Sequence, residues 1–385
     1  MATVDNHTEK THKRLRWPIY SLRTLFFVVT LLCMSMAWLA VVANRARQQG
    51  RAVAKVGELG GYLYFDYGRE ADGSRMQVDN FELRDANNDV GVIRKLWAPK
   101  WLRSALGEEL FRSVNTVNLG RRSPQPDDLR LLRDLPGVKG VFLFKNPSVT
   151  DESLGFVADL TSLEGLDFSE TEVTDAGLIH VARLRGLNQL WMFMTAVTDD
   201  GTVNLEGLKS LELLDIRWTA IGDRALQHFA GLRSLKELFL GGTKVTDDGL
   251  KYLAELTDLE QLDLSDTHVR GPGLRDLSHL SKLKGLYLDG TLIDDQSLTF
   301  AQELPALTHL ALAKTKFTDE GLAPISKIKS LEWLSLGETA ITDAGLEHLA
   351  GLLSLTELWL RGTKITDAGV AQLQKALPRC KITSK

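Results

Sequence analysis

LEWLSLGETAITDAGLEHLAGLLS, residues 331–354, is one unit of a 24-residue repeat. The same frame begins at nine leucines, from Leu163 to Leu355 in steps of 24 residues, and two weaker units begin at Val114 and Val138. The second weak unit carries one extra residue near Pro147. Together the units cover residues 114–378. A fixed period of this length predicts a solenoid, in which each unit packs only on its neighbours.

The apolar positions within a unit predict its elements. Leucines at positions 1, 4 and 6 alternate like the buried face of a short strand, and those at positions 16, 19 and 22 have the spacing of one helix face. In the quoted unit they are Leu331, Leu334, Leu336, Leu346, Leu349 and Leu352. We therefore expect an α/β fold, a right-handed solenoid with a parallel concave sheet and convex helices.

Three further columns recur in the frame. Position 9 is threonine in all nine clear units, and we expect its hydroxyl to bond the backbone of an adjacent unit. Aspartate at position 13, as in Asp343, follows a threonine and suits the start of a helix, where the helix dipole favours negative charge. Position 15 is glycine in seven of the nine units, which indicates a close approach between neighbouring units.

These columns resemble the leucine-rich-repeat superfamily, whose signature is L-x-x-L-x-L followed by a polar residue. The resemblance covers about two-thirds of the chain. The family's usual asparagine is here replaced by Thr171, Thr195, Thr219, Thr243, Thr267, Thr291, Thr315, Thr339 and Thr363. The variant is similar to the T-x-I/V-T-D-x-G-L repeats of bacterial membrane-attached and effector proteins.

An apolar segment lies near the N-terminus. Residues 25–43, LFFVVTLLCMSMAWLAVVA, contain no charge and would span roughly 28 Å as a helix, which matches the hydrocarbon core of a bilayer. The run is longer than the core of a signal peptide, so we expect an uncleaved single-pass anchor. Five basic residues precede it and four follow it closely, which weakly favours a cytoplasmic N-terminus and an extracytoplasmic solenoid.

The predicted domain plan follows from these segments. Residues 1–24 form a basic tail, 25–43 the anchor, 44–113 a juxtamembrane helix and N-terminal cap region, 114–378 the solenoid and 379–385 a C-terminal cap. Within the cap region, residues 62–67 suggest a strand, and residues 101–111 an amphipathic helix that would cover the first unit. Residues 379–382 would add a last short strand.

Composition excludes several functions. Residues 1–60 carry a charge of +6 and the whole chain −4, so residues 61–385 carry −10, which disfavours a nucleic-acid partner. The sequence contains no recognisable catalytic motif and implies no enzyme, cofactor or metal site. His180, His228 and His348 recur at one convex position, too far apart to share a metal, and we expect them to be solvated.

The concave face is the candidate site, because strand positions 3, 5 and 7 point away from the core. Large aromatic, acidic and arginine side chains gather there and are typical of contact surfaces. The predicted ligand-binding residues are Trp191, Phe193, Asp215, Arg217, Trp218, Phe239, Asp263, Tyr287, Asp289, Trp359 and Arg361. The sequence favours a membrane-tethered module that binds a protein or peptide. It leaves open a structural envelope scaffold and a glycan-binding receptor.

Overall fold

The computed structural model describes residues 22–65, 114–135 and 137–384, and the chain divides into two compact units, Met1–Gln48 and Gln49–Lys385. The described part of the first unit belongs to helix α1 (Leu22–Glu58), which continues into the second unit. Residues 44–58, expected to begin the juxtamembrane region, are thus helical. Phe26–Glu58 is the one stretch of the described residues long and apolar enough to cross a membrane.

The second unit is a solenoid built on one sheet whose strand order follows the sequence. Strand β1 pairs antiparallel with β2, and every later strand pairs parallel with the one before it. The strands are β1 (Tyr62–Phe65), β2 (Val114–Asn118), β3 (Gly140–Phe142), β4 (Gly165–Asp167), β5 (Gln189–Trp191), β6 (Leu213–Asp215), β7 (Glu237–Phe239), β8 (Gln261–Asp263), β9 (Gly285–Tyr287), β10 (His309–Ala311), β11 (Trp333–Ser335), β12 (Glu357–Trp359) and β13 (Lys381–Thr383).

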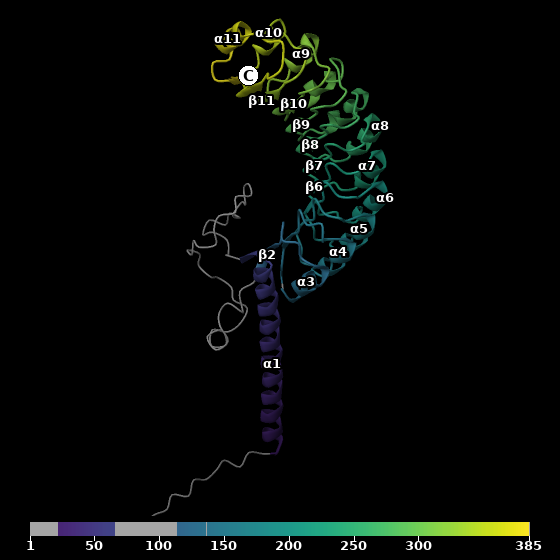
Figure 1. The fold of residues 1–385 in the computed structure, drawn as a ribbon, viewed down its shortest axis with the longest axis vertical. Helices are drawn as coiled ribbons and strands as arrows, with labels where there is room; N and C mark the ends of the chain where they lie inside the picture. Colours follow the sequence, from purple (N-terminus) through teal and green to yellow (C-terminus); the bar gives the residue numbers. More distant parts are fainter. Residues whose placement is uncertain (1–21, 66–113, 136, 385) are drawn as a thin grey trace, which may run out of the picture. The chain divides into compact units, whose positions relative to one another are not determined.

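Short helices follow the strands and cover the convex side, as Figure 1 shows. The α-helices are α3 (Pro126–Arg130), α4 (Asp151–Val157), α5 (Asp175–Val181), α6 (Asp199–Thr202), α7 (Asp223–Phe229), α8 (Asp247–Leu250), α9 (Leu322–Ile325), α10 (Leu346–Leu349) and α11 (Asp367–Ala376). The 3₁₀ helices are η2 (Leu131–Asp134), η3 (Val203–Leu205), η4 (Lys251–Leu253), η5 (Pro272–His279), η6 (Thr299–Glu303) and η7 (Asp319–Gly321). The solenoid prediction is confirmed, and the leucines of positions 1, 4, 6, 16, 19 and 22 in the quoted unit are all at most 4 % exposed.

The threonine column does not link neighbouring units, so that expectation is wrong. Each of the nine hydroxyls donates to the carbonyl three residues earlier in its own unit, as Thr267 Oγ1 does to Leu264 O at 2.6 Å. A hydroxyl on Cβ reaches only its own turn. Asn146, which is longer, spans the gap: its Nδ2 donates to Leu119 O of the preceding unit at 2.8 Å.

The aspartate column links the units instead. Asp319 Oδ1 accepts from the Thr342 amide at 2.8 Å, and Asp319 Oδ2 accepts from Thr342 Oγ1 at 2.6 Å. The Thr342 hydroxyl in turn accepts from the Ala344 amide at 3.3 Å at the start of the next helical turn. Each carboxylate therefore fixes the start of the helix in the following unit, and its negative charge also stabilises the N-terminus of the helix in its own unit. We call this chain of contacts the Asp–Thr ladder.

The glycine column is explained by the ladder. A Cβ on Gly177 would lie 2.6 Å from Asp151 Oδ1, the carboxylate of the preceding unit. The exception at Ser297 follows the same rule, because the preceding unit has Gly271 where the aspartate would stand. A side chain on Gly271 would collide with Ser297 Oγ, so the serine side chain occupies the space that an aspartate side chain would otherwise fill. The ladder breaks at this place, and both flanking units carry only a 3₁₀ helix, η5 and η6.

The first unit of the solenoid is covered by the end of α1 and by β1. Ala52 and Val56 are at most 2 % exposed and belong to the same apolar cluster as Val117 and Leu119. Lys55 Nζ lies 3.2 Å from Asp128 Oδ1. The helix expected over residues 101–111 lies outside the described residues. At the other end β13 supplies the expected last strand.

Candidate functional site

The concave face consists of the strand residues at positions 3 and 5 and the turn residues at positions 7 and 8. At position 5 the aromatic rings of Trp191, Phe239 and Tyr287 are partly buried, and Trp359 is 40 % exposed. Neighbouring rings contact each other across strands, as Phe142 and Trp191 do with centroids 6.0 Å apart. Part of this aromatic surface therefore stabilises the sheet.

The aspartates between these rings have a structural role that the sequence did not reveal. Asp167, Asp215 and Asp263 each accept the amide two residues later through Oδ1, at 2.9, 3.2 and 2.9 Å, which fixes the turn that leaves the strand. Asp215 is only 2 % exposed and Asp167 8 %. Asp215, one of the predicted ligand-binding residues, is thus buried by the fold, whereas Asp263 remains partly exposed.

Burial also changes the ionisation of Asp167. Desolvation raises the pKa of its carboxyl to about 6, and the nearby charges of Asp215 and Glu170 act in the same direction. The hydrogen bond that the Ser169 amide donates to the carboxyl opposes this shift in the pKa without cancelling it.

Arg217 is held in place by three neighbours. Its Nε and Nη2 donate to Asp215 Oδ1 and Oδ2 at 2.9 and 2.7 Å. Its guanidinium carbon lies 5.8 Å from the ring centroid of Phe193 and 5.3 Å from that of Phe239. The hydrogen bonds that Arg217 donates to Asp215 raise the pKa of Arg217 above its ordinary value. The result is a rigid, partly exposed cation between two aromatic rings.

Two large apolar side chains stand exposed at the C-terminal edge of these strands. Met194 is 50 % exposed and Trp218 is 51 % exposed, at position 8 of consecutive units. Both have positive φ, 52° and 55°, so the backbone adopts the left-handed region there. A side chain on Gly242 would collide with the Trp218 ring, so the glycine of the next unit gives the indole its place on the sheet. Among the predicted ligand-binding residues between Trp191 and Tyr287, only Trp218 is exposed, and the others are half-buried or buried.

The sequence prediction missed the aromatic residues at position 3. The Trp333 ring lies 6.5 Å from that of Tyr287 and stacks on His309 with centroids 6.3 Å apart. Position 3 points to the same side as position 5, so the alternation of the strand was the signal that could have found them. Trp359 and Arg361 lie exposed three units beyond Tyr287 and Asp289, so the predicted residues form two separate groups.

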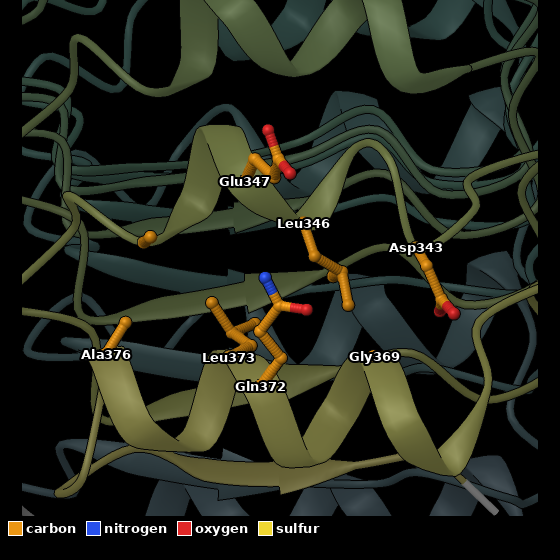
Figure 2. A pocket seen from close by; sticks show the side chains of 8 residues that line it. Asp343, Leu346, Glu347, Gly369, Gln372, Leu373 and Ala376 are labelled. Carbon is orange, nitrogen blue, oxygen red and sulfur yellow. The ribbon is translucent and has the colours of Figure 1, made fainter.

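The convex surface offers a shallow groove of about 180 Å³ between α10 and α11, shown in Figure 2. Leu346 and Leu373 line it, with Glu347 and Gln372 also on its walls. Asp343, at one end, is already engaged by Thr366, whose hydroxyl and amide lower the pKa of the carboxyl. The groove is therefore lined mainly by apolar side chains, and its aspartate is already hydrogen-bonded, so we do not assign it a ligand.

His228 departs from the expectation of a solvated surface histidine. Its side chain is 14 % exposed, and Nδ1 lies 2.6 Å from Glu206 Oε1 of the preceding unit. The described residues contain no group of three or more potential metal ligands.

Comparisons with known proteins agree with this architecture. A family model described as leucine-rich repeat matches residues 231–254 and 304–326. The search of curated proteins found no match. An internalin from Listeria monocytogenes is 17 % identical with a TM-score of 0.49, over 74 % of this chain and 93 % of that one.

Two receptors show the same fold. A structure described as a TDR receptor has a TM-score of 0.50 at 20 % identity, over 71 % of this chain and 47 % of that chain. The Arabidopsis receptor kinase HAESA, solved with the peptide hormone IDA and the co-receptor SERK1, has a TM-score of 0.50 at 19 % identity, over 66 % and 43 %. This chain spans less than half of either receptor chain. The 24-residue frame, the two matches of the family model and the shared solenoid together support a leucine-rich-repeat protein.

Proposed function

We propose that this protein is a membrane-tethered module that binds a protein or peptide on the concave face of its solenoid. The observation that carries the proposal is the pair Met194 and Trp218, each about half exposed. These side chains fill no core, and Arg217 adjoins both residues: the Met194 amide donates to Arg217 O at 2.9 Å, and Trp218 follows Arg217 in the chain. Exposed tryptophan and methionine beside an ordered arginine are typical of the centre of a protein-binding surface.

The geometry favours a peptide over a glycan. Beside Met194 and Trp218 the carboxylates are not available to sugar hydroxyls, because Asp215 gives both oxygens to Arg217 and Asp167 is buried. A pure scaffold, the third function, would not require exposed apolar groups on the inner face. The receptor kinase HAESA, whose solenoid has this fold, was solved in complex with a peptide hormone, which supports a peptide as the ligand class.

The membrane tether rests on α1. The side chains of Phe26, Met34 and Trp38 are 72, 74 and 50 % exposed, so no protein core covers them. Thr30 Oγ1 donates to Phe26 O and Ser35 Oγ to Leu32 O, so the polar groups of the segment are satisfied within the helix. We propose residues 25–43 as the span, residues 1–24 as the cytoplasmic tail and the solenoid as extracytoplasmic.

A capture experiment tests the binding role. Full-length protein in nanodiscs would be used to recover partners from a membrane and secreted protein extract, and the double variant Met194→Ala/Trp218→Ala would be compared with it. We expect the partner to be lost with little change in melting temperature, because both side chains are exposed. Leu353→Ala is the matched control, since Leu353 is 82 % exposed in the turn between α10 and β12. If every recovered partner survives the double variant, the concave face is not the binding surface.

Two other substitutions are poor probes of binding. Arg217→Ala would leave the buried carboxylate of Asp215 without its cation, so it would lower stability as well as binding. His228→Ala would remove the partly buried contact with Glu206, so it is unsuitable as a silent control on the convex side.

A further inference from the structure

The concave side of β7, β8 and β9 is uniformly acidic. Positions 3, 5, 7 and 8 of these three units hold four carboxylates and no lysine or arginine. We call this region the acidic strip; its residues are Glu237, Asp263, Asp266 and Asp289. It lies directly beside the unit that carries Trp218.

The carboxylates of the acidic strip form no ion pair within the described part of the chain, whereas acids just outside it do. Along the edge at position 2, Lys236 pairs with Glu212 at 2.8 Å and Lys284 with Glu260 at 2.6 Å. The nearest concave cations are engaged elsewhere: Arg217 binds Asp215, and Lys314 lies 3.9 Å from Glu338. Lys236, Lys314 and Arg217 act on the strip's carboxylates only from a distance, so the strip carries negative charge that no direct ion pair neutralises among the described residues.

Mutual repulsion within the strip is visible in its ionisation. Burial raises the pKa of Asp289, and the charges of Asp263 and Asp266 raise it further. Burial and the charge of Glu260, which lies just outside the strip, raise the pKa of Glu237, and the charge of Lys236 lowers it. Burial raises the pKa of the Tyr287 hydroxyl, with Asp263 and Glu237 adding to the shift. A cation placed over the strip would relieve this repulsion.

Apolar and acidic surface lie within reach of one extended peptide. In the sheet register Asp263 stands between Phe239 and Tyr287, so the strip has aromatic rings on both sides. From the unit of Trp218 to that of Asp289 are three strand spacings, about 15 Å. An extended chain of four or five residues covers that distance.

Resting on the proposed binding function, we propose that the ligand is an extended peptide segment with a large apolar side chain on Met194 and Trp218 and lysine or arginine side chains over the acidic strip. Charge complementarity and the fixed spacing between the two surfaces define this chemistry. The basic and apolar residues of the ligand would be separated by about three to five positions.

A selection experiment tests the ligand class. A display library of random nonapeptides would be selected on the full-length protein in phosphatidylcholine nanodiscs, after removal of peptides that bind empty nanodiscs. We expect the bound peptides to be enriched in lysine and arginine at that distance from an aromatic or aliphatic residue. Raising the NaCl concentration should weaken their binding, because exposed charges are screened.

Charge-neutral variants identify the surface. Asp266→Asn/Asp289→Asn should weaken the selected peptides at least about tenfold, since two charges opposite the ligand are lost. The amide side chain introduced at position 289 keeps an acceptor oxygen for the Ala313 amide, which Asp289 binds at 2.6 Å in the wild type. The control Asp248→Asn/Glu320→Gln changes the net charge equally with exposed residues on the convex side, and it should leave affinity unchanged.

The outcomes separate this inference from the function on which it rests. Selected peptides without basic residues, whose binding is still lost in Trp218→Ala, would overturn the charge inference and leave the binding function standing. Failure to select any peptide that depends on Met194 or Trp218 would refute both. Self-association of the protein that the double asparagine variant abolishes would make a second copy of the chain the occupant and would also overturn the inference.

Discussion

The position-9 threonine shows how one hydroxyl contributes to each unit. Thr267 is 3 % exposed, and its Oγ1 donates to Leu264 O at 2.6 Å. Thr267→Val keeps the shape and leaves that buried carbonyl without this donor, so we expect a loss of about 1–2 kcal/mol in the free energy of unfolding. Urea denaturation measures it. Thr161→Val, at an exposed threonine, is the control, and equal effects at both positions would contradict the role of the bond.

Asp167 makes stability depend on pH. Its pKa is about 6 in the folded protein and 3.8 in an unperturbed carboxyl, so the proton favours folding. This contribution is complete below pH 3.8 and is lost as the pH rises through 6. Asp167→Asn removes the charge and retains an acceptor for the Ser169 amide, so the variant should gain up to about 3 kcal/mol over the wild type at pH 8.

The gain should shrink to a few tenths of a kcal/mol toward pH 4, where the wild-type carboxyl is about 99 % protonated in the folded state and about 40 % protonated in the unfolded state. Urea denaturation of both proteins at pH 4 and pH 8 measures the difference. A difference that stays constant between these two pH values would show that Asp167 does not titrate in this range.

At the scale of the element, the Asp–Thr ladder restricts which residue can stand at position 15, in the first turn of each helix. A Cβ on Gly201 in α6 would lie 2.9 Å from Asp175 Cα and would also collide with the carboxylate. Helix propensity alone predicts that Gly201→Ala stabilises by about 1 kcal/mol. We expect the opposite, a loss of about 2 kcal/mol or more, because the backbone contact cannot relax.

Gly207→Ala is the matched control for this prediction, because a Cβ there meets no atom within 4 Å. Thermal and urea denaturation of the two variants compares them directly. A stabilised Gly201→Ala variant would show that the units are not held together through the Asp–Thr ladder.

At the scale of the whole molecule, α1 serves both the proposed membrane span and the cap of the solenoid. Ala52 and Val56 cover the first unit, so a chain that begins at Gln49 keeps the cap and one that begins at residue 60 loses it. We expect both to leave the membrane fraction, and the shorter chain to melt several degrees lower. Circular dichroism measures the melting temperatures, and equal values would mean that α1 does not cap the solenoid.

The sequence alone determined the solenoid, because its period records which side chains each unit must bury. Leucines at fixed positions have no stable arrangement except stacked units, and their spacing distinguishes strand from helix without any tertiary information. The same reasoning placed Trp218 and Arg217 on the concave face, since alternation along a strand assigns each residue to one side.

Only the tertiary structure decided which groups meet across units. The sequence assigned the link to the threonine column, but side-chain length gives it to Asp319 and its equivalents, which reach the next unit. It also assigned Asp215 to a ligand, although the fold buries that carboxylate beneath Arg217. Contacts between residues about one repeat apart depend on reach and packing in three dimensions. A periodic pattern gives the side of the sheet on which a residue stands, and the partner of its side chain follows only from the folded arrangement.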